Sequence, residues 1–136
     1  MASAVVRWIG GKQFVGIDST KHSVVLSTAD EGVGMKPSEL LLVALASCTA
    51  VDVVEILGKK RLTLTALSIS ATAEQEADPP WTFRKIHLKY QLTGPDLTDA
   101  AVAQAIALSE EKYCSVASTV RGKAEITYEY EIVKGD

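Results

Sequence analysis

The chain has 136 residues, a net charge of −3 and an apolar fraction of 47% with only 6% aromatics. This length predicts one domain, residues 1–136, with a core built mainly of aliphatic side chains. The negative charge argues against a nucleic-acid partner, because neutralising phosphates requires a clustered basic face. The basic run at residues 59–61 is interpreted as a helix end that complements its own dipole.

Hydrophobic periodicity and turn signals divide the chain into alternating strands and helices. The predicted elements are strands at residues 4–9, 13–17 and 23–26, a helix at 37–57, strands at 62–76 and 81–92, a helix at 97–112 and a strand at 124–133. Pro37 suits the first position of a helix, and Gly58 is a natural terminator. The order βββαββαβ predicts an α+β fold with a long central helix packed on an antiparallel sheet.

The longest apolar stretch, residues 40–57, contains Asp52 and Glu55. Because charges are costly in lipid, we interpret this stretch as a core helix and expect no membrane partner. No secretory signal opens the sequence, and two cysteines without such a signal indicate the reducing cytoplasm. The two histidines, His22 and His87, are isolated in the sequence, so no metal site is predicted.

Cys48 lies in the middle of the predicted long helix, where its plainest interpretation is a small buried apolar side chain. Helical spacing places Asp52 and Glu55 on the same stripe as Cys48. A fully buried stripe does not normally carry two carboxylates, so this stripe is expected to face a cleft or a subunit boundary. The alternative is that the two carboxylates form ion pairs with Lys59 or Arg61.

Cys114 follows the second predicted helix at its C-terminal end. The helix dipole does not favour a thiolate at that end, so Cys114 is the poorer candidate for an attacking sulfur. It is a reasonable candidate for a resolving sulfur. The spacing of the two cysteines along the chain does not by itself prove that they meet.

Two segments of the sequence resemble motifs of the OsmC/Ohr family of cysteine-dependent hydroperoxide reductases. The segments KPSELL at 36–41 and ALASCT at 44–49 resemble the family's helix with the reactive cysteine. The segment SEEKYCSV at 109–116 resembles the family's second-cysteine motif. The element order also matches the family fold over essentially the full length. The finer pattern, VDVVEIL at 51–57 and TDAA at 98–101, is most similar to the YhfA-like branch.

The resemblance implies an intertwined homodimer with the cysteine site at the subunit boundary. It also implies a thiol-dependent peroxidase that reduces organic hydroperoxides in oxidative-stress defence. In this chemistry Cys48 attacks the peroxide and becomes a sulfenic acid, and Cys114 then condenses with it to a disulfide. An external dithiol restores both thiols, and no cofactor or metal is required.

The sequence departs from the Ohr branch at two supporting positions. There a Glu directly after the helix proline and an Arg hold the thiolate and the peroxide, but Ser38 stands at the matching position here. Glu39 falls on the opposite helix face from Cys48 and is interpreted as a helix-start residue. The supporting candidates are therefore Asp52 and Arg7, the one arginine before the helix, whose plainest interpretation is a solvated strand residue.

A mid-helix cysteine without a fixed cation nearby is expected to remain a thiol, which weakens the peroxidase hypothesis. Two alternatives follow. The first is a non-catalytic protein that binds a small apolar ligand in an OsmC-type interfacial cleft. The second is a redox sensor in which a disulfide between Cys48 and Cys114 changes the dimer.

Overall fold

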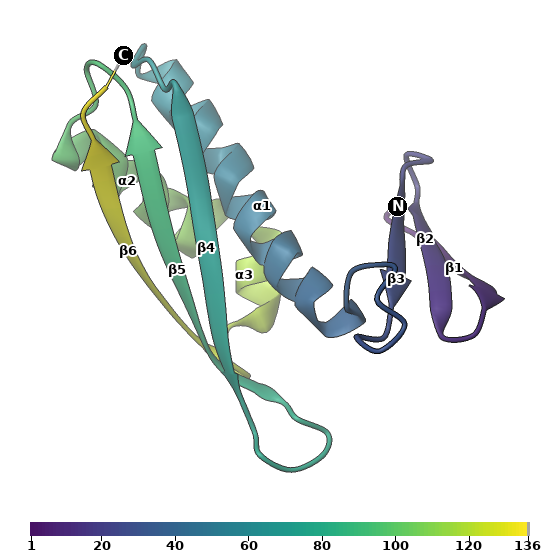
Figure 1. Ribbon diagram of the computed structural model, residues 1–136. Helices are drawn as coiled ribbons and strands as arrows, with labels where there is room; N and C mark the ends of the chain where they lie inside the picture. The colour runs from purple at the N-terminus through teal and green to yellow at the C-terminus, as the bar shows by residue number, and fades with distance from the viewer. Residues whose placement is uncertain (136) are drawn as a thin grey trace. The chain divides into compact units, whose positions relative to one another are not determined.

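The computed structural model describes residues 1–135 and contains two compact units, Met1–Leu41 and the chain from Leu42 onward (Figure 1). The long helix α1 (Pro37–Lys59) begins in the first unit and belongs mostly to the second. Each unit is built around its own three-stranded sheet. A single domain over residues 1–136 stays a prediction.

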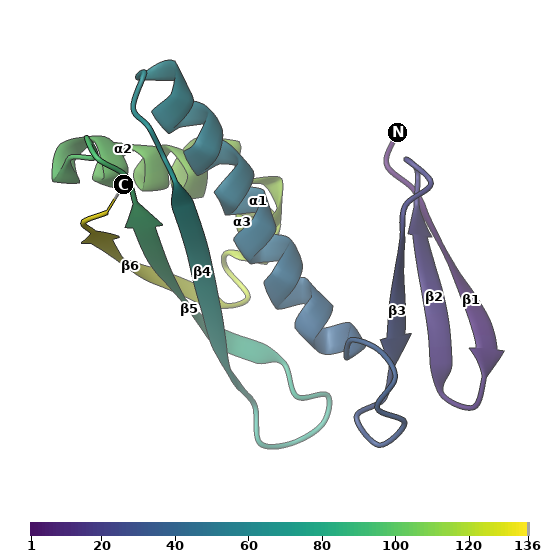
Figure 2. The same ribbon diagram turned by 45° about the horizontal axis from the view of Figure 1, so that its top comes forward.

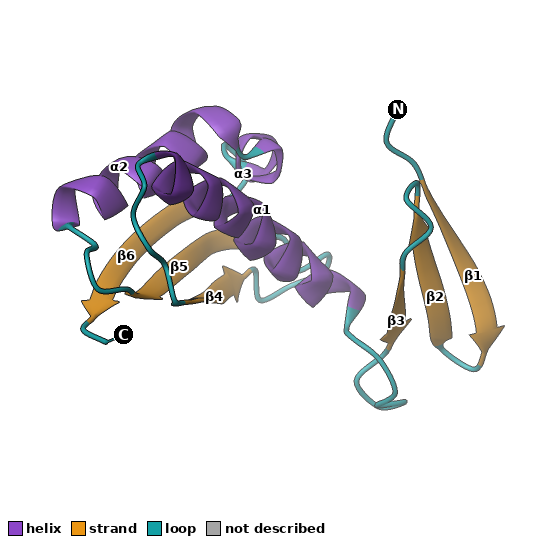
Figure 3. Cartoon of the chain, turned by 90° about the horizontal axis from the view of Figure 1, so that it is seen from above, coloured by secondary structure: helices purple, strands orange, loops and turns teal. Residues whose placement is uncertain are grey.

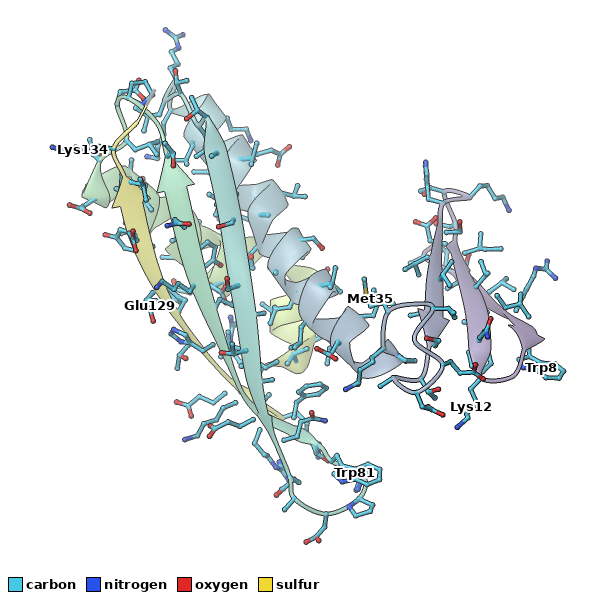
Figure 4. All side chains as sticks on the ribbon, in the orientation of Figure 1. Trp8, Lys12, Met35, Trp81, Glu129 and Lys134 are labelled. Atoms are coloured by element: carbon cyan, nitrogen blue, oxygen red, sulfur yellow. The ribbon has the colours of Figure 1, made fainter. Side chains whose placement is uncertain are left out.

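The first unit is an antiparallel meander in the order β1-β2-β3 (Figure 2). Its strands are β1 (Ala4–Gly10), β2 (Gln13–Asp18) and β3 (Ser23–Ser27). The three predicted strands are therefore confirmed, and each ends one residue later than expected. Gly10 and Gly11 form the first turn with φ of 111° and 52°, a backbone region that favours glycine. The Trp8 side chain lies at this end of the unit (Figure 4), where Nε1 donates to the Gly11 carbonyl oxygen at 2.7 Å.

The second unit places its helices on one face of a three-stranded sheet (Figure 3). The sheet has the order β4-β5-β6 and consists of β4 (Ala66–Gln75), β5 (Phe83–Thr93) and β6 (Glu125–Val133). Besides α1, the helical layer contains α2 (Asp99–Leu108), a π-helical turn (Ser109–Tyr113) and α3 (Ser115–Val120). The predicted α+β class, with a long helix packed on a sheet, is confirmed.

One pairing in this sheet differs from the prediction. The β4 and β5 strands pair antiparallel as expected, but β5 and β6 pair in parallel from Lys85–Glu125 to Thr93–Val133. The sheet is therefore mixed, and the expectation of an entirely antiparallel sheet is wrong for this pair. A crossover through the helices between β5 and β6 returns the chain to the same end of the sheet, which makes the two strands parallel.

The second helical region also differs from the prediction of one helix at residues 97–112. Thr98 caps α2 as expected, and its Oγ1 accepts from the Ala101 N–H at 3.2 Å. The α2 helix then gives way to the π-helical turn, and the short α3 after Cys114 was missed. Six residues are too few for a helical period to show in the sequence.

The core forms where α1 packs on the sheet. The α1 side chains that face it are spaced by four residues: Leu45, Thr49, Val53 and Leu57. The β5 side chains that face it alternate, as the sequence pattern predicted: Ile86, Leu88, Tyr90 and Leu92. By length and composition α1 could also cross a membrane. Its buried stripe, however, agrees with the predicted core helix.

The packing of β5 against α1 predicts a sharp contrast between neighbouring residues. Leu88→Ala should lower the free energy of unfolding by about 2–5 kcal/mol, because it leaves a cavity among fully buried side chains. Lys89→Ala, one residue further on, alters an exposed side chain and should change that free energy by no more than about 0.5 kcal/mol. Urea denaturation of the two variants measures both values, and equal losses would contradict this packing.

Candidate functional site

The second unit brings the two predicted cysteines together. Cys48 lies half-buried on α1, and Cys114 lies between the π-helical turn and α3 with 2% of its surface exposed. Both are free thiols, and the Cys48 side chain lies close enough to Cys114 to raise the pKa of the Cys114 thiol. The sequence alone left this contact open.

Local backbone geometry fixes the position of Cys114. Its N–H donates to the Ser109 carbonyl oxygen at 2.9 Å, which closes the π-helical turn. Its Sγ accepts from the Ala117 N–H at 3.3 Å and so caps the first turn of α3. The expectation that Cys114 simply follows a helix C-terminus is therefore incomplete, because a second helix begins at this residue.

The Cys114 thiol is held in its protonated form. Burial raises the pKa of Cys114 to about 11, and the neighbouring Cys48 side chain acts in the same direction. An ordinary cysteine has a pKa of about 8.5, so Cys114 is overwhelmingly a neutral thiol at pH 7. This agrees with the prediction that Cys114 is the poorer nucleophile, although burial is the main cause rather than a helix dipole.

A hydrogen bond at Asp52 connects α1 to the π-helical turn. Its Oδ2 accepts from the Ser109 hydroxyl at 2.8 Å, one helical turn beyond Cys48. Within residues 1–135, neither Asp52 nor Glu55 forms an ion pair with Lys59 or Arg61. The alternative that these ion pairs explain the two carboxylates is therefore not supported.

An open pocket of about 520 Å³ lies beside this contact. It is lined by side chains from α1, α2 and the π-helical turn: Asp52, Glu55, Ile56, Lys59, Lys60, Gln104, Leu108 and Tyr113. The predicted stripe of Cys48, Asp52 and Glu55 thus borders a hollow, as expected, although Cys48 itself does not line it. The volume is within the range of small-molecule sites.

Sequence reasoning missed a buried carboxyl group next to the cysteine pair. Glu110 is only 4% exposed, and its Oε1 accepts from the Tyr90 hydroxyl at 3.0 Å. The Arg121 guanidinium donates to the Glu110 carbonyl oxygen and lies 3.8 Å from Oε2. Burial raises the pKa of the Glu110 carboxyl above its usual value. The stripe of Val102, Ile106 and Glu110, spaced by four residues, was the signal that could have located it.

The other supporting candidate, Arg7, lies in the first unit, as do Ser38 and Glu39 at the start of α1. Arg7 is an exposed residue of β1, and Ser38 is exposed at the start of α1. Glu39 pairs with Lys36 at 3.3 Å, as expected of a helix-start residue. Since the cysteines belong to the second unit, a role for Arg7 beside Cys48 stays a prediction. Among residues 1–135, the structure has no cluster of His, Cys, Asp and Glu able to hold a metal ion.

The mixed α+β fold, with two cysteines brought close together, defines a class of small two-cysteine proteins. Comparison with known sequences identifies the family. Residues 28–129 match the family model described as OsmC-like protein. The chain is also 38% identical over 130 residues to the protein YhfA of Escherichia coli strain K12, covering 96% of this chain and 97% of that protein. The chain belongs to the OsmC family.

Solved structures show the same fold. A protein from Aquifex aeolicus VF5 is 27% identical, with a TM-score of 0.90 and coverage of 100% of this chain and 98% of that one. An OsmC-like protein from Mycoplasma pneumoniae is 18% identical, with a TM-score of 0.80 and coverage of 98% and 96%. The organic hydroperoxide resistance protein OhrB of Bacillus subtilis is 15% identical, with a TM-score of 0.65 and coverage of 96% and 98%. Structural neighbours of the family thus include hydroperoxide resistance proteins.

The raised pKa of Glu110 predicts a pH-dependent stability difference. A carboxyl group whose pKa is higher in the folded chain contributes its full stability below its unfolded value, near pH 4.5. That contribution is lost as the pH rises through the folded value. Relative to Glu110→Gln, the wild type should therefore lose unfolding free energy as the pH rises above about 4.5, by about 1.4 kcal/mol per unit of pKa shift.

Denaturation of both proteins at a series of pH values measures this difference. Glu111→Gln is the matched control, because it changes an exposed carboxylate on the same turn and should follow the wild type throughout. If the unfolding free energies of the wild type and Glu110→Gln change with pH in parallel, the pKa of Glu110 is the same in the folded and unfolded chain, and the prediction is wrong.

Proposed function

We propose that this protein is a thiol-dependent peroxidase for organic hydroperoxides, with Cys48 as the attacking and Cys114 as the resolving cysteine. The observation that carries the proposal is the proximity of the two free thiols, which lie close enough for Cys48 to raise the pKa of Cys114. Two neighbouring free thiols on separate segments are the pair that a disulfide would join. The hydroperoxide resistance proteins among the structural neighbours support the same chemistry.

The reaction has three balanced steps. The Cys48 thiolate attacks one peroxide oxygen, the O–O bond breaks, and the alcohol leaves after taking a proton, so that Cys48 becomes a sulfenic acid. The Cys114 sulfur then displaces the hydroxyl group as water and forms the S–S bond. An external dithiol reduces this bond by thiol–disulfide exchange and leaves as its own disulfide. The expected setting is the cytoplasm, where such dithiols are kept reduced.

The division of roles follows from burial. Cys48 is the more exposed sulfur, whereas Cys114 is buried and keeps its proton. A buried, protonated thiol at Cys114 is a poor nucleophile toward peroxide. Attack by Cys48 and resolution by Cys114 is therefore the favoured order.

OsmC/Ohr proteins are commonly homodimers, and two exposed apolar surfaces support an intertwined homodimer here. On α1, Val43, Val51 and Val54 form an exposed stripe beside the face that carries Cys48. In the first unit, β1 exposes apolar side chains from both of its faces: Val5, Val6, Trp8 and Ile9. A second copy that covers the α1 stripe would also shelter Cys48 from water.

Peroxide treatment tests the cysteine assignment. After one equivalent of cumene hydroperoxide, mass spectrometry of digests should show an intramolecular disulfide between Cys48 and Cys114. In Cys114→Ser the sulfenic acid has no resolving partner, so excess peroxide should drive Cys48 to sulfinic acid. Cys48→Ser is the control and should leave Cys114 unoxidised, because that thiol is buried and protonated. Free thiols in the wild type under excess peroxide would refute the peroxidase.

The homodimer predicts a mass of about 29 kDa in sedimentation, twice the 14.5 kDa of one chain. Val51→Asp places a charge in the exposed α1 stripe and should shift the protein toward the monomer. Ala100→Asp adds the same charge to an exposed position of α2 outside that stripe and should remain dimeric. A wild type that sediments as a folded monomer would exclude a site completed by a second copy.

The pocket beside Asp52 favours a second candidate, a non-catalytic protein that binds a small molecule. Its lining contains both charges and the apolar side chains of Ile56, Leu108 and Tyr113, which suits an amphipathic ligand. Unreactive thiols together with ligand binding at this pocket would favour this function. A disulfide that forms and changes the dimer, without turnover of peroxide, would favour a redox sensor.

A further inference from the structure

We propose that Glu110 is a positioning residue that fixes the turn carrying Cys114, so that Cys114 resolves oxidised Cys48 before a second peroxide can react. The proposal rests on the proposed function, because it concerns the second step of that reaction. Glu110 contacts no reacting sulfur in the structure, and its effect is exerted through the chain segment that it anchors.

Glu110 holds both ends of the segment in which Cys114 lies. On one side the buried Tyr90 of β5 donates its hydroxyl hydrogen to Oε1 at 3.0 Å. On the other side Arg121, which ends α3, donates to the Glu110 carbonyl oxygen and faces Oε2 at 3.8 Å. The segment from residue 110 to residue 121 is therefore closed by its own side chains and attached to the sheet at Tyr90.

The same network reaches the helix that carries Cys48. Thr49, the residue after Cys48, is fully buried and lies close enough to the Tyr90 hydroxyl to affect its pKa. One turn further along α1, Asp52 holds Ser109, the residue before Glu110, at 2.8 Å. One direct hydrogen bond, and the proximity of Thr49 to the Tyr90 that binds Glu110, therefore connect the α1 turn that follows Cys48 to the π-helical turn that precedes Cys114.

Stability alone does not account for a carboxyl group at this position. Removing a carboxyl from water is costly, and one hydrogen bond from Tyr90 with a loose ion pair to a partly exposed arginine compensates for only part of that cost. An apolar side chain would continue the buried stripe of Val102 and Ile106 without this cost. What the carboxyl supplies, and an apolar side chain cannot, is a directional acceptor for the Tyr90 hydroxyl together with an oxygen that faces Arg121 at 3.8 Å. Small displacements of reacting groups are known to slow reactions greatly.

The test separates the two oxidation steps in Glu110→Ala. With cumene hydroperoxide, the loss of the Cys48 thiol should proceed at the wild-type rate. Formation of the disulfide should be slower by roughly tenfold, and the fraction of Cys48 sulfinic acid should rise accordingly. Glu110→Gln keeps an acceptor for Tyr90 and should restore most of the disulfide rate. Glu111→Ala removes the neighbouring exposed carboxylate and should behave as the wild type.

A second oxidant distinguishes failure of this proposal from failure of the peroxidase. Diamide takes up two electrons and two protons from a pair of thiols and forms a disulfide without peroxide. If peroxide does not oxidise the wild type, the proposed peroxidase function is refuted. Diamide should still form the disulfide, and more slowly in Glu110→Ala than in the wild type.

Circular dichroism establishes that each variant is folded. If Glu110→Ala does not fold, Tyr90→Phe removes only the donor hydroxyl and should slow the disulfide step in the same direction. Wild-type disulfide rates with both oxidants in a folded Glu110→Ala, or in Tyr90→Phe in its place, would overturn the proposal.

Discussion

The packing of the buried α1 stripe on β5 is the interaction on which the rest of the site depends. It orients α1 so that Leu45, Thr49 and Val53 face the sheet, which leaves Cys48 at the edge of the buried face. It also places Thr49 against Tyr90, the β5 side chain that holds Glu110. The proximity of the two cysteines is thus a consequence of ordinary core packing. A few buried hydroxyl and carboxyl groups fix the orientation of the segments that carry them.

The sequence predicted the fold better than it predicted the site. Long alternating or four-spaced apolar patterns located every strand and both longer helices, because such patterns reflect burial directly. Parallel pairing of β6 was not predictable in this way, since alternation is the same in both directions. The π-helical turn and α3 were missed because they are too short to show a period. Glu110 was missed because it stands beside Glu111, and two adjacent glutamates are normally both exposed. Only the four-residue spacing from Val102 and Ile106 indicates that Glu110 is the buried one.

Glu110 allows the supporting residues of this chain to be compared with those of the Ohr branch. In that branch a Glu and an Arg act on the reactive thiolate, and Ser38 leaves this chain without the first of them. A Glu–Arg pair is nevertheless present near the cysteines, built from Glu110 and Arg121, and it belongs to the segment of Cys114. Under our proposals, the same two residue types would serve the resolving cysteine here and the attacking cysteine there.

The parallel pairing of β5 with β6 has a consequence for the meeting of the two sulfurs. A parallel pair requires a crossover, so the segment with Cys114 is a loop closed at both ends by strands of one sheet. A thiol on such a loop samples a small volume around its partner, whereas a thiol on a free chain end samples a large one. The topology therefore gives Cys114 a high effective concentration at Cys48, which no change of concentration in the cell can dilute.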